Sequence, residues 1–123
     1  MKNAVRSLVP MAFVASVRRS IEFYEKLGFV VGNTFAAPGA AELNWAWLKS
    51  TGAQLMLARA TEPVIPERQS VMFYLHCDNV VSMRKALTAK GIETGLLKFP
   101  FYAPKGEFRI TDPDGYVLVV THS

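Results

Sequence analysis

The predicted order of strands and helices repeats halfway along the chain, and this repeat limits the fold more than any other feature. When residue 9 is aligned with residue 71, the positions that begin helices, end helices and precede a final strand fall within one residue of each other. The matched pairs are Ser16 with Asp78, Gly28 with Gly91, and Gly52 with Gly115. A period of about half the chain predicts two copies of one structural unit.

The first half reads as a strand, a helix and three further strands. A helix is predicted over residues 17–27, with Ser16 as its N-cap and Gly28 at its end. Short apolar runs predict the strands, which cover residues 9–15, 29–35, 43–49 and 53–58.

The second half repeats this order after a linker. Residues 62–66 include two prolines and no periodic pattern, so they separate a first module, residues 1–61, from a second, residues 67–123. Asp78 or Asn79 caps the second helix, and Gly91 ends it. The strands are predicted over residues 71–77, 92–97, 107–111 and 116–120, with a tight turn at Asp114-Gly115 before the last.

Each half is therefore a βαβββ unit, and the fold class is α+β. One helix covers only one face of a four-stranded sheet, which leaves the other face open. We expect the two modules to form one domain with a cupped mixed sheet whose concave face accepts a ligand.

Composition excludes several classes of function. The chain of 123 residues has one cysteine, so it forms no internal disulfide and fits the cytoplasm. No apolar run reaches the ~18 residues needed to span a membrane, and we expect no signal peptide. The net charge of +4 favours an anionic or neutral ligand over a polycation, but the scattered basic residues predict no nucleic-acid binding.

Two motifs give the chain a family resemblance. Ser16-Val-Arg-Arg-Ser-Ile-Glu-Phe-Tyr-Glu-Lys-Leu-Gly-Phe29 and Asp112-Pro-Asp-Gly115 resemble the vicinal oxygen chelate superfamily. That group includes glyoxalase I, extradiol dioxygenases, and fosfomycin- and bleomycin-resistance proteins. The resemblance implies paired βαβββ modules, usually in a homodimer.

The family's metal-binding positions carry no metal ligand here. Metalloenzymes of this family place His, Gln or Glu at four equivalent positions, which fall on Val9, Met56, Val71 and Val119. None of these side chains offers a nitrogen or an anionic oxygen, and a soft thioether does not suit this type of site. The resemblance therefore implies no metal and no cofactor, as in the bleomycin-resistance branch. The resemblance does not imply the cationic drug that this branch binds, because those proteins are acidic, whereas this chain has a net charge of +4.

Alternation along strands predicts which side chains line the cup. The expected ligand-binding residues include Met56 and Val119 at the metal positions. The others are Phe13, Phe73, Trp45, Trp47, Glu107, Arg109 and Tyr102. Arg109 offers a fork for a carboxylate or phosphate, and Tyr102 belongs to an aromatic loop that could close the mouth. Three alternatives stay open: an Arg109–Glu107 structural pair, tryptophans packed under a helix, and ordinary loop packing of Tyr102.

His76 and Cys77 are less promising. Alternation from Val71 places His76 on the side opposite the cup, and Cys77 reads as a small buried apolar residue. The leading hypothesis is a metal-independent protein that sequesters an aromatic or weakly anionic small molecule. The alternatives are a glyoxalase-like lyase or isomerase, or dioxygenase-family enzyme, acting through Arg109 and Glu107, and a subunit-interaction module.

Overall fold

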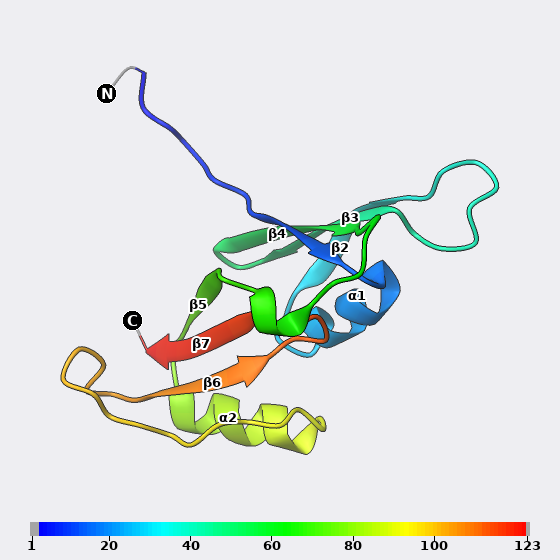
Figure 1. Cartoon of the computed structure of the whole chain (residues 1–123). Coiled ribbons are helices and arrows are strands. Elements are labelled where there is room, and N and C mark those ends of the chain that lie inside the picture. Colours follow the sequence, from blue (N-terminus) through cyan, green and yellow to red (C-terminus); the bar gives the residue numbers. More distant parts are fainter. Residues whose placement is uncertain (1–2, 123) are drawn as a thin grey trace. The chain divides into compact units, whose positions relative to one another are not determined.

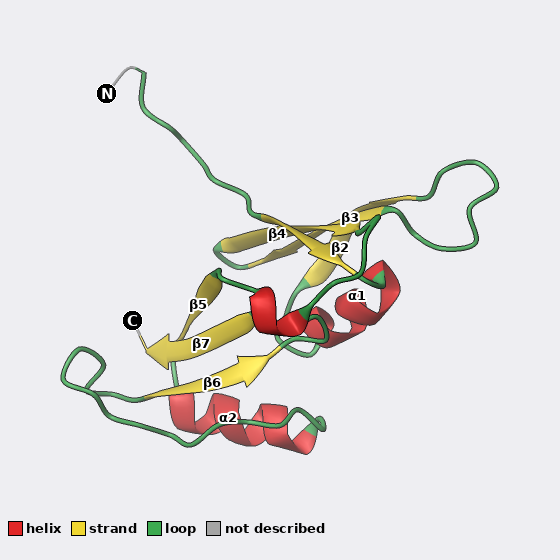
Figure 2. Ribbon diagram, viewed as in Figure 1, coloured by secondary structure: helices red, strands yellow, loops and turns green. Residues whose placement is uncertain are grey.

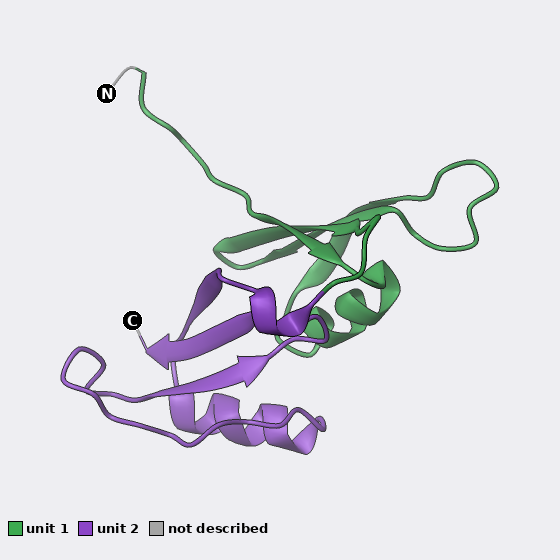
Figure 3. Cartoon of the chain, viewed as in Figure 1, with its two compact units in different colours: residues 1–64 green, residues 65–123 purple. Residues whose placement is uncertain are grey.

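The computed structural model describes residues 3–122, and the chain divides into two compact units. The first unit is Met1–Val64 and the second is Ile65–Ser123 (Figure 3). Each unit has its own sheet and its own α-helix, so the fold is mixed α+β, as the repeat predicted (Figure 2). No helix in residues 3–122 is long and apolar enough to cross a membrane.

The first unit contains four strands around one helix (Figure 1). Its elements are β1 (Met11–Val14), α1 (Val17–Glu25), β2 (Val30–Phe35), β3 (Trp45–Ser50) and β4 (Ala53–Arg59). The strand order is β1-β4-β3-β2, with β1 parallel to β4 and the other pairs antiparallel. The helix is therefore the crossover that joins two strands running in the same direction.

The two faces of this sheet differ in composition. On one face, Ala12, Ala46 and Leu57 are aligned across three strands and are almost fully buried. The apolar side of α1, with Val17 and Tyr24, is also buried, and α1 contacts β2, β3 and β4. This face and α1 form the core of the first unit, while side chains of the opposite parity point away from the helix.

One residue at each end explains where α1 begins and where the chain leaves it. The Ser16 side chain accepts a hydrogen bond from the backbone N–H of Arg19 at 3.2 Å, which confirms it as the N-cap. The helix ends at Glu25, two residues earlier than predicted, and Gly28 has a φ of +97° where the chain turns into β2. Glycine adopts this conformation without the penalty that a side chain brings.

The second unit has three strands and one α-helix. Its elements are the short 3-10 helix η1 (Pro66–Arg68), β5 (Met72–Cys77), α2 (Val80–Ala89), β6 (Glu107–Thr111) and β7 (Val117–His122). The order is β5-β7-β6, with β5 parallel to β7 and β6 antiparallel to β7. Thus the first and last strands pair in parallel in both units, which is the structural form of the sequence repeat.

The strand predicted over residues 92–97 is wrong. Two contacts align this segment with β6: Lys98 forms an isolated bridge with Glu107, and the Gly95 N–H donates to the Arg109 carbonyl at 2.8 Å. Gly95 and Lys98 are three residues apart, but their partners Arg109 and Glu107 are only two residues apart. The register therefore slips between the two contacts, and no continuous ladder forms. Gly95 lies at the slip, where a Cβ atom would come within 3.1 Å of the Arg109 carbonyl oxygen.

Side-chain hydrogen bonds and close packing against η1 both fix the turn before β7. One Asp112 carboxylate oxygen accepts hydrogen bonds from the N–H groups of Asp114 and Tyr116, both at 2.9 Å. Gly115 has a φ of +89°, and a Cβ atom there would lie 2.6 Å from the Cα of Pro66 in η1. The glycine is therefore required both by the turn conformation and by the close approach of η1.

We predict that Gly115→Ala destabilises the protein by roughly 2–3 kcal/mol, because it adds strain at positive φ and a clash with backbone. The matched control is Gly52→Ala at the equivalent position of the first unit, where nothing lies within 4 Å of the added Cβ and φ is not in the left-handed region. It should change stability by less than about 0.5 kcal/mol. Urea unfolding of both variants checks this; equal losses would contradict it.

The start of α2 gives a second prediction. The Asn79 side chain accepts a hydrogen bond from the Ser82 N–H at 3.0 Å, so Asn79 is the N-cap and Asp78 precedes it. Asn79→Ala should therefore lower the free energy of unfolding by about 1 kcal/mol. Asp78→Ala is the neighbouring control and should cost clearly less. The reverse order in thermal or urea unfolding would assign the cap to Asp78.

Candidate functional site

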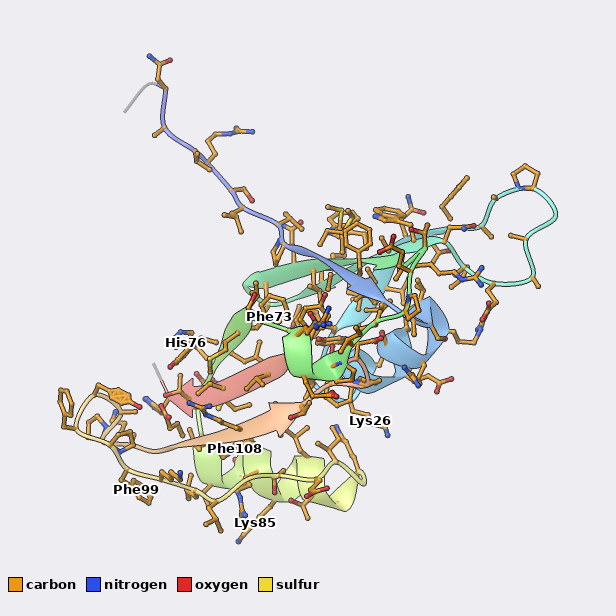
Figure 4. All side chains as sticks on the ribbon, viewed as in Figure 1. Lys26, Phe73, His76, Lys85, Phe99 and Phe108 are labelled. Carbon is orange, nitrogen blue, oxygen red and sulfur yellow. The ribbon has the colours of Figure 1, made fainter. Side chains whose placement is uncertain are left out.

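Arg109 lies on the face of the second sheet that α2 does not cover. Its register partner on β7 is Val119, which pairs in turn with Tyr74 on β5. Arg109 and Tyr74 are exposed and Val119 is fully buried. The neighbouring residue Phe108 has the opposite parity, is 1% exposed, and lies between β6 and α2 in Figure 4. We call the side that faces away from α2 the Arg109 face.

Glu107 lies on the same face, one step along the strand pair. It pairs with Thr121 on β7, which pairs with His76 on β5. On its other side, Glu107 exchanges two backbone hydrogen bonds with Lys98, of 2.8 and 2.9 Å. Glu107, Lys98 and Arg109 therefore share one side of this edge of the sheet, as was expected for Glu107 and Arg109.

Phe73 does not lie on the Arg109 face, and this expectation is wrong. Its register partner is Leu118, whose parity is opposite to that of Val119. Phe73 instead stacks on Tyr116, with ring centroids 5.8 Å apart and the ring planes 22° apart. It is half-buried on the same sheet face as the α2-side core.

A one-residue error in the helix start caused this misplacement. Val71 precedes Asp78 by seven residues, as Val9 precedes Ser16, and alternation from Val71 gives Phe73. Counting back from the observed cap, Asn79, gives Met72, which pairs with Val117 on the Arg109 face. A shift of one residue moves every side chain of a strand to the other face.

The same one-residue shift changes the sheet face on which His76 lies. Sequence alternation placed it away from the cup, but it shares the Arg109 face with Glu107 through Thr121 (Figure 4). Tyr74 and Lys98 were missed entirely as residues of this face. The second candidate cap, Asn79, was the signal for Tyr74, whereas nothing in the sequence indicated the bridge that positions Lys98.

A cavity of about 650 Å³ adjoins Arg109 and Glu107. Its wall is formed by β6 and by the segment and loop before it, and it lies entirely within the second unit. The lining residues are Gly95, Leu96, Lys98, Phe99, Pro100, Tyr102, Glu107, Phe108 and Arg109. The structure thus brings Arg109, Glu107 and Tyr102 together around one hollow, with Val119 beside Arg109 in the sheet.

The charged groups of this cavity are not neutralised by each other. Arg109 and Glu107 are two residues apart on one strand, yet no ion pair joins them in residues 3–122. Arg109 is exposed, whereas Glu107 is only 6% exposed. Lys98 is exposed on the opposite side of Glu107. The structural pair that was one explanation for Arg109 is absent from the described part of the chain.

The loop over residues 99–106 supplies aromatic side chains. Phe99 and Tyr102 are 61% and 58% exposed, and Phe101 contacts Tyr102 edge-on with centroids 5.4 Å apart. Gly106 ends the loop with a φ of +107°, and an added Cβ would lie 3.2 Å from the Phe99 ring. The loop begins and ends at the Lys98–Glu107 bridge, so its aromatic rings are attached beside the charged groups.

The first unit gathers the other predicted residues on the sheet face away from α1. Trp47 pairs with Met56, which pairs with Met11. Two residues along, Trp45 and Phe13 are both partners of Ala58, so the tryptophans do not pack under the helix. These aromatic and methionine side chains form a continuous apolar surface on β1, β4 and β3.

Polar groups fix the orientation of Trp47. Its indole N–H donates to the Gln54 side-chain oxygen at 3.0 Å, and the Lys49 ammonium lies 5.5 Å from the ring centroid. Gly32, at a register shift in β2, allows the ring to approach, since a Cβ there would lie 3.1 Å from it. A hollow of about 450 Å³ adjoins Trp47 at the β3–β4 hairpin.

These residues do not fit the metal site that the fold allows. Met56 and Val119 occupy the last-strand positions and offer a thioether and two methyl groups, while Val9 and Val71 or Met72 offer no better donor. Within residues 3–122, no group of three or more His, Cys, Asp or Glu side chains comes together.

Cys77 shows no sign of activation as a nucleophile. Burial raises the pKa of the Cys77 thiol, and the negative charge of Asp78 acts in the same direction. A hydrogen bond from the Asn79 backbone opposes these effects without overcoming them. Cys77 is half-buried at the end of β5, opposite His122 in register, and remains a thiol at neutral pH.

Several solved structures share this fold over almost the full chain. A bleomycin resistance determinant encoded on the transposon Tn5 has a TM-score of 0.78, with 16% identity, and the alignment covers 97% of this chain and 98% of that one. A bleomycin-binding protein complexed with bleomycin has a TM-score of 0.77, with 16% identity and coverage of 97% and 99%. TnmS3, an antibiotic-binding protein from Streptomyces sp. CB03234, has a TM-score of 0.74, with 19% identity and coverage of 99% and 98%. At these identities the similarity establishes the fold alone.

Sequence comparison identifies the family. No protein of curated function matches the chain significantly. The model of the Glyoxalase/Bleomycin resistance protein/Dioxygenase superfamily, however, matches residues 7–120. This match covers the repeated strands, both helices and the cavity beside Arg109. The chain therefore belongs to the glyoxalase/bleomycin resistance protein/dioxygenase superfamily.

Proposed function

We propose that this protein binds a small molecule without a metal ion, and that the ligand is an aromatic or weakly anionic compound held beside Arg109. The observation that carries this proposal is the state of Arg109 itself. Arg109 lines a cavity of about 650 Å³ and has no ion pair in residues 3–122. An unpaired guanidinium is a strong site for a carboxylate, which it binds with two parallel hydrogen bonds.

The surrounding side chains support the aromatic part of the proposal. Phe99 and Tyr102 leave more than half of their surface exposed while lining the same cavity. A flat ring placed against them would remove apolar surface from water and would gain from ring stacking. The tryptophan surface around Trp47 and Trp45 offers a similar contact within the first unit.

Donor chemistry supports the proposal of metal independence, and charge supports the proposed ligand class. The apolar side chains of Met56 and Val119 stand where a metal-dependent relative would need ligands. The names of two structural neighbours describe binding of bleomycin and of an antibiotic, which favours binding as the general role. A net charge of +4 and a pI of about 9.4 favour an anionic ligand for this chain.

The proposal includes a homodimer. Met11, Phe13 and Phe35 lie on strands of the first unit and are 45%, 54% and 55% exposed, so a second copy would remove a large apolar surface from water. Size-exclusion chromatography with light scattering should give about twice the chain mass of 13.6 kDa. A monomer at tens of micromolar concentration would contradict this part of the proposal.

Arg109→Ala should abolish ligand stabilisation. In a thermal-shift screen of aromatic acids, a ligand at 100 times its dissociation constant should stabilise the wild type by ~2.7 kcal/mol, and the variant should show almost none of this. Lys105→Ala is the control, because it removes one positive charge from the loop before β6, at a residue that does not line the cavity.

The metal-free part is tested with the same ligand. Binding should be unchanged after exhaustive treatment with EDTA and after addition of Ni²⁺, Co²⁺, Mn²⁺ or Zn²⁺. Loss of binding with EDTA, or stoichiometric metal in the purified protein, would refute metal independence. Equal ligand stabilisation of wild type and Arg109→Ala would refute the assigned role of Arg109.

A further inference from the structure

The Glu107 carboxylate has no side-chain or backbone partner among residues 3–122. The residue is 6% exposed and lines the cavity, and its side chain makes no ion pair or hydrogen bond with any residue of the described range 3–122. No fully buried side-chain oxygen or nitrogen in that range lacks a partner. The carboxylate oxygens of Glu107 must therefore keep their remaining accessible surface, which the cavity provides.

The backbone holds Glu107 in place. Its N–H donates to the Lys98 carbonyl at 2.8 Å, and its carbonyl accepts from the Lys98 N–H at 2.9 Å. The other neighbour, Thr121, uses its hydroxyl on the Gly106 carbonyl at 3.4 Å. An ionised carboxylate that is mostly removed from water costs free energy until a donor reaches it. The fixed position and the missing donor together point to a group supplied from outside the chain.

Glu107 and Arg109 present opposite chemistry at a fixed spacing. Alternate residues of a strand are about 6.5–7 Å apart along one face. Arg109 can bind a carboxylate at one end of a ligand, while Glu107 can accept a hydrogen bond from a donor at the other end. Lys98 adds a second cation, so the cavity carries one more positive than negative group. This balance suits a ligand with a single negative charge.

We propose that the ligand is an aromatic monocarboxylate that also carries a hydroxyl or amino hydrogen-bond donor, with the carboxylate on Arg109 and the donor on Glu107. This inference rests on the proposed function and narrows it. The ring of such a compound would lie between the two polar groups, against Phe99 and Tyr102. An aromatic cation without a carboxylate would meet the like charges of Lys98 and Arg109, which oppose its binding.

The test uses three related probes with the full chain. 4-Hydroxyphenylacetate has both the carboxylate and the donor, phenylacetate lacks the donor, and 4-hydroxyphenethylamine replaces the carboxylate by a cation. Isothermal titration calorimetry should give about tenfold tighter binding for 4-hydroxyphenylacetate than for phenylacetate, the effect expected of one hydrogen bond to a charged acceptor. The amine should not bind detectably.

Glu107→Gln should remove this discrimination. The substitution keeps the shape of the side chain but removes the charge, so the two acids should bind within about threefold of each other, with phenylacetate no weaker than in the wild type. Glu93→Gln is the control, because Glu93 is an exposed acid on the preceding segment and does not line the cavity. It should retain the tenfold preference.

The possible failures are distinguishable. If phenylacetate and 4-hydroxyphenylacetate bind equally well to the wild type and both need Arg109, the proposed function stands and this inference is refuted. A preference that survives in Glu107→Gln also refutes it, because the donor then binds elsewhere. If no aromatic acid binds, both the inference and the proposed function are refuted.

Discussion

Parallel pairing between the first and last strands of each unit determines which side chains meet. The β1–β4 and β5–β7 pairs each need a crossover helix, because parallel strands cannot be joined by a tight turn. The helix then covers one face of its sheet, and alternation assigns every other side chain to the opposite face. In the second unit this places Arg109, Val119 and Tyr74 in one row across three strands. The candidate site depends on that row more than on any single residue.

The sequence predicted most of this framework because local signals and periodicity agreed. The Ser16 cap, the positive φ of Gly28 and the four strands of the first unit follow from residues that act within a few positions of themselves. The strand over residues 92–97 failed because its pairing depends on register with β6, which lies more than ten residues further along the chain. A register slip at Gly95 is not visible in composition or alternation.

The site was predicted less completely, and for a specific reason. Arg109 and Glu107 share one face of β6, as alternation predicts for a strand with a clear turn after it. Phe73 and His76 were assigned to the wrong faces because two residues, Asp78 and Asn79, are equally good caps by type. The choice between them changes the parity of the whole preceding strand. Lys98 was missed because its place follows from a bridge formed by an irregular segment.

The apolar residues at the metal positions bear on whether this family member is an enzyme or a binding protein. The superfamily name includes enzymes and binding proteins, so membership alone does not choose between them. Met56 and Val119 remove the donors that metal chemistry needs, while Arg109 and Lys98 provide charge of the sign that an anionic ligand needs. These side chains are the basis on which we propose recognition of a molecule by shape and charge.

The Lys98–Glu107 bridge separates the loop over residues 99–106 from the rest of the second unit. Both ends of the loop are tied by paired backbone hydrogen bonds, and those bonds do not depend on which side chains the loop carries. Insertions or substitutions between the two tied ends would alter the aromatic wall while the β6–β7 ladder keeps its register. The aromatic wall of the cavity can thus be changed by substitution without a change of fold.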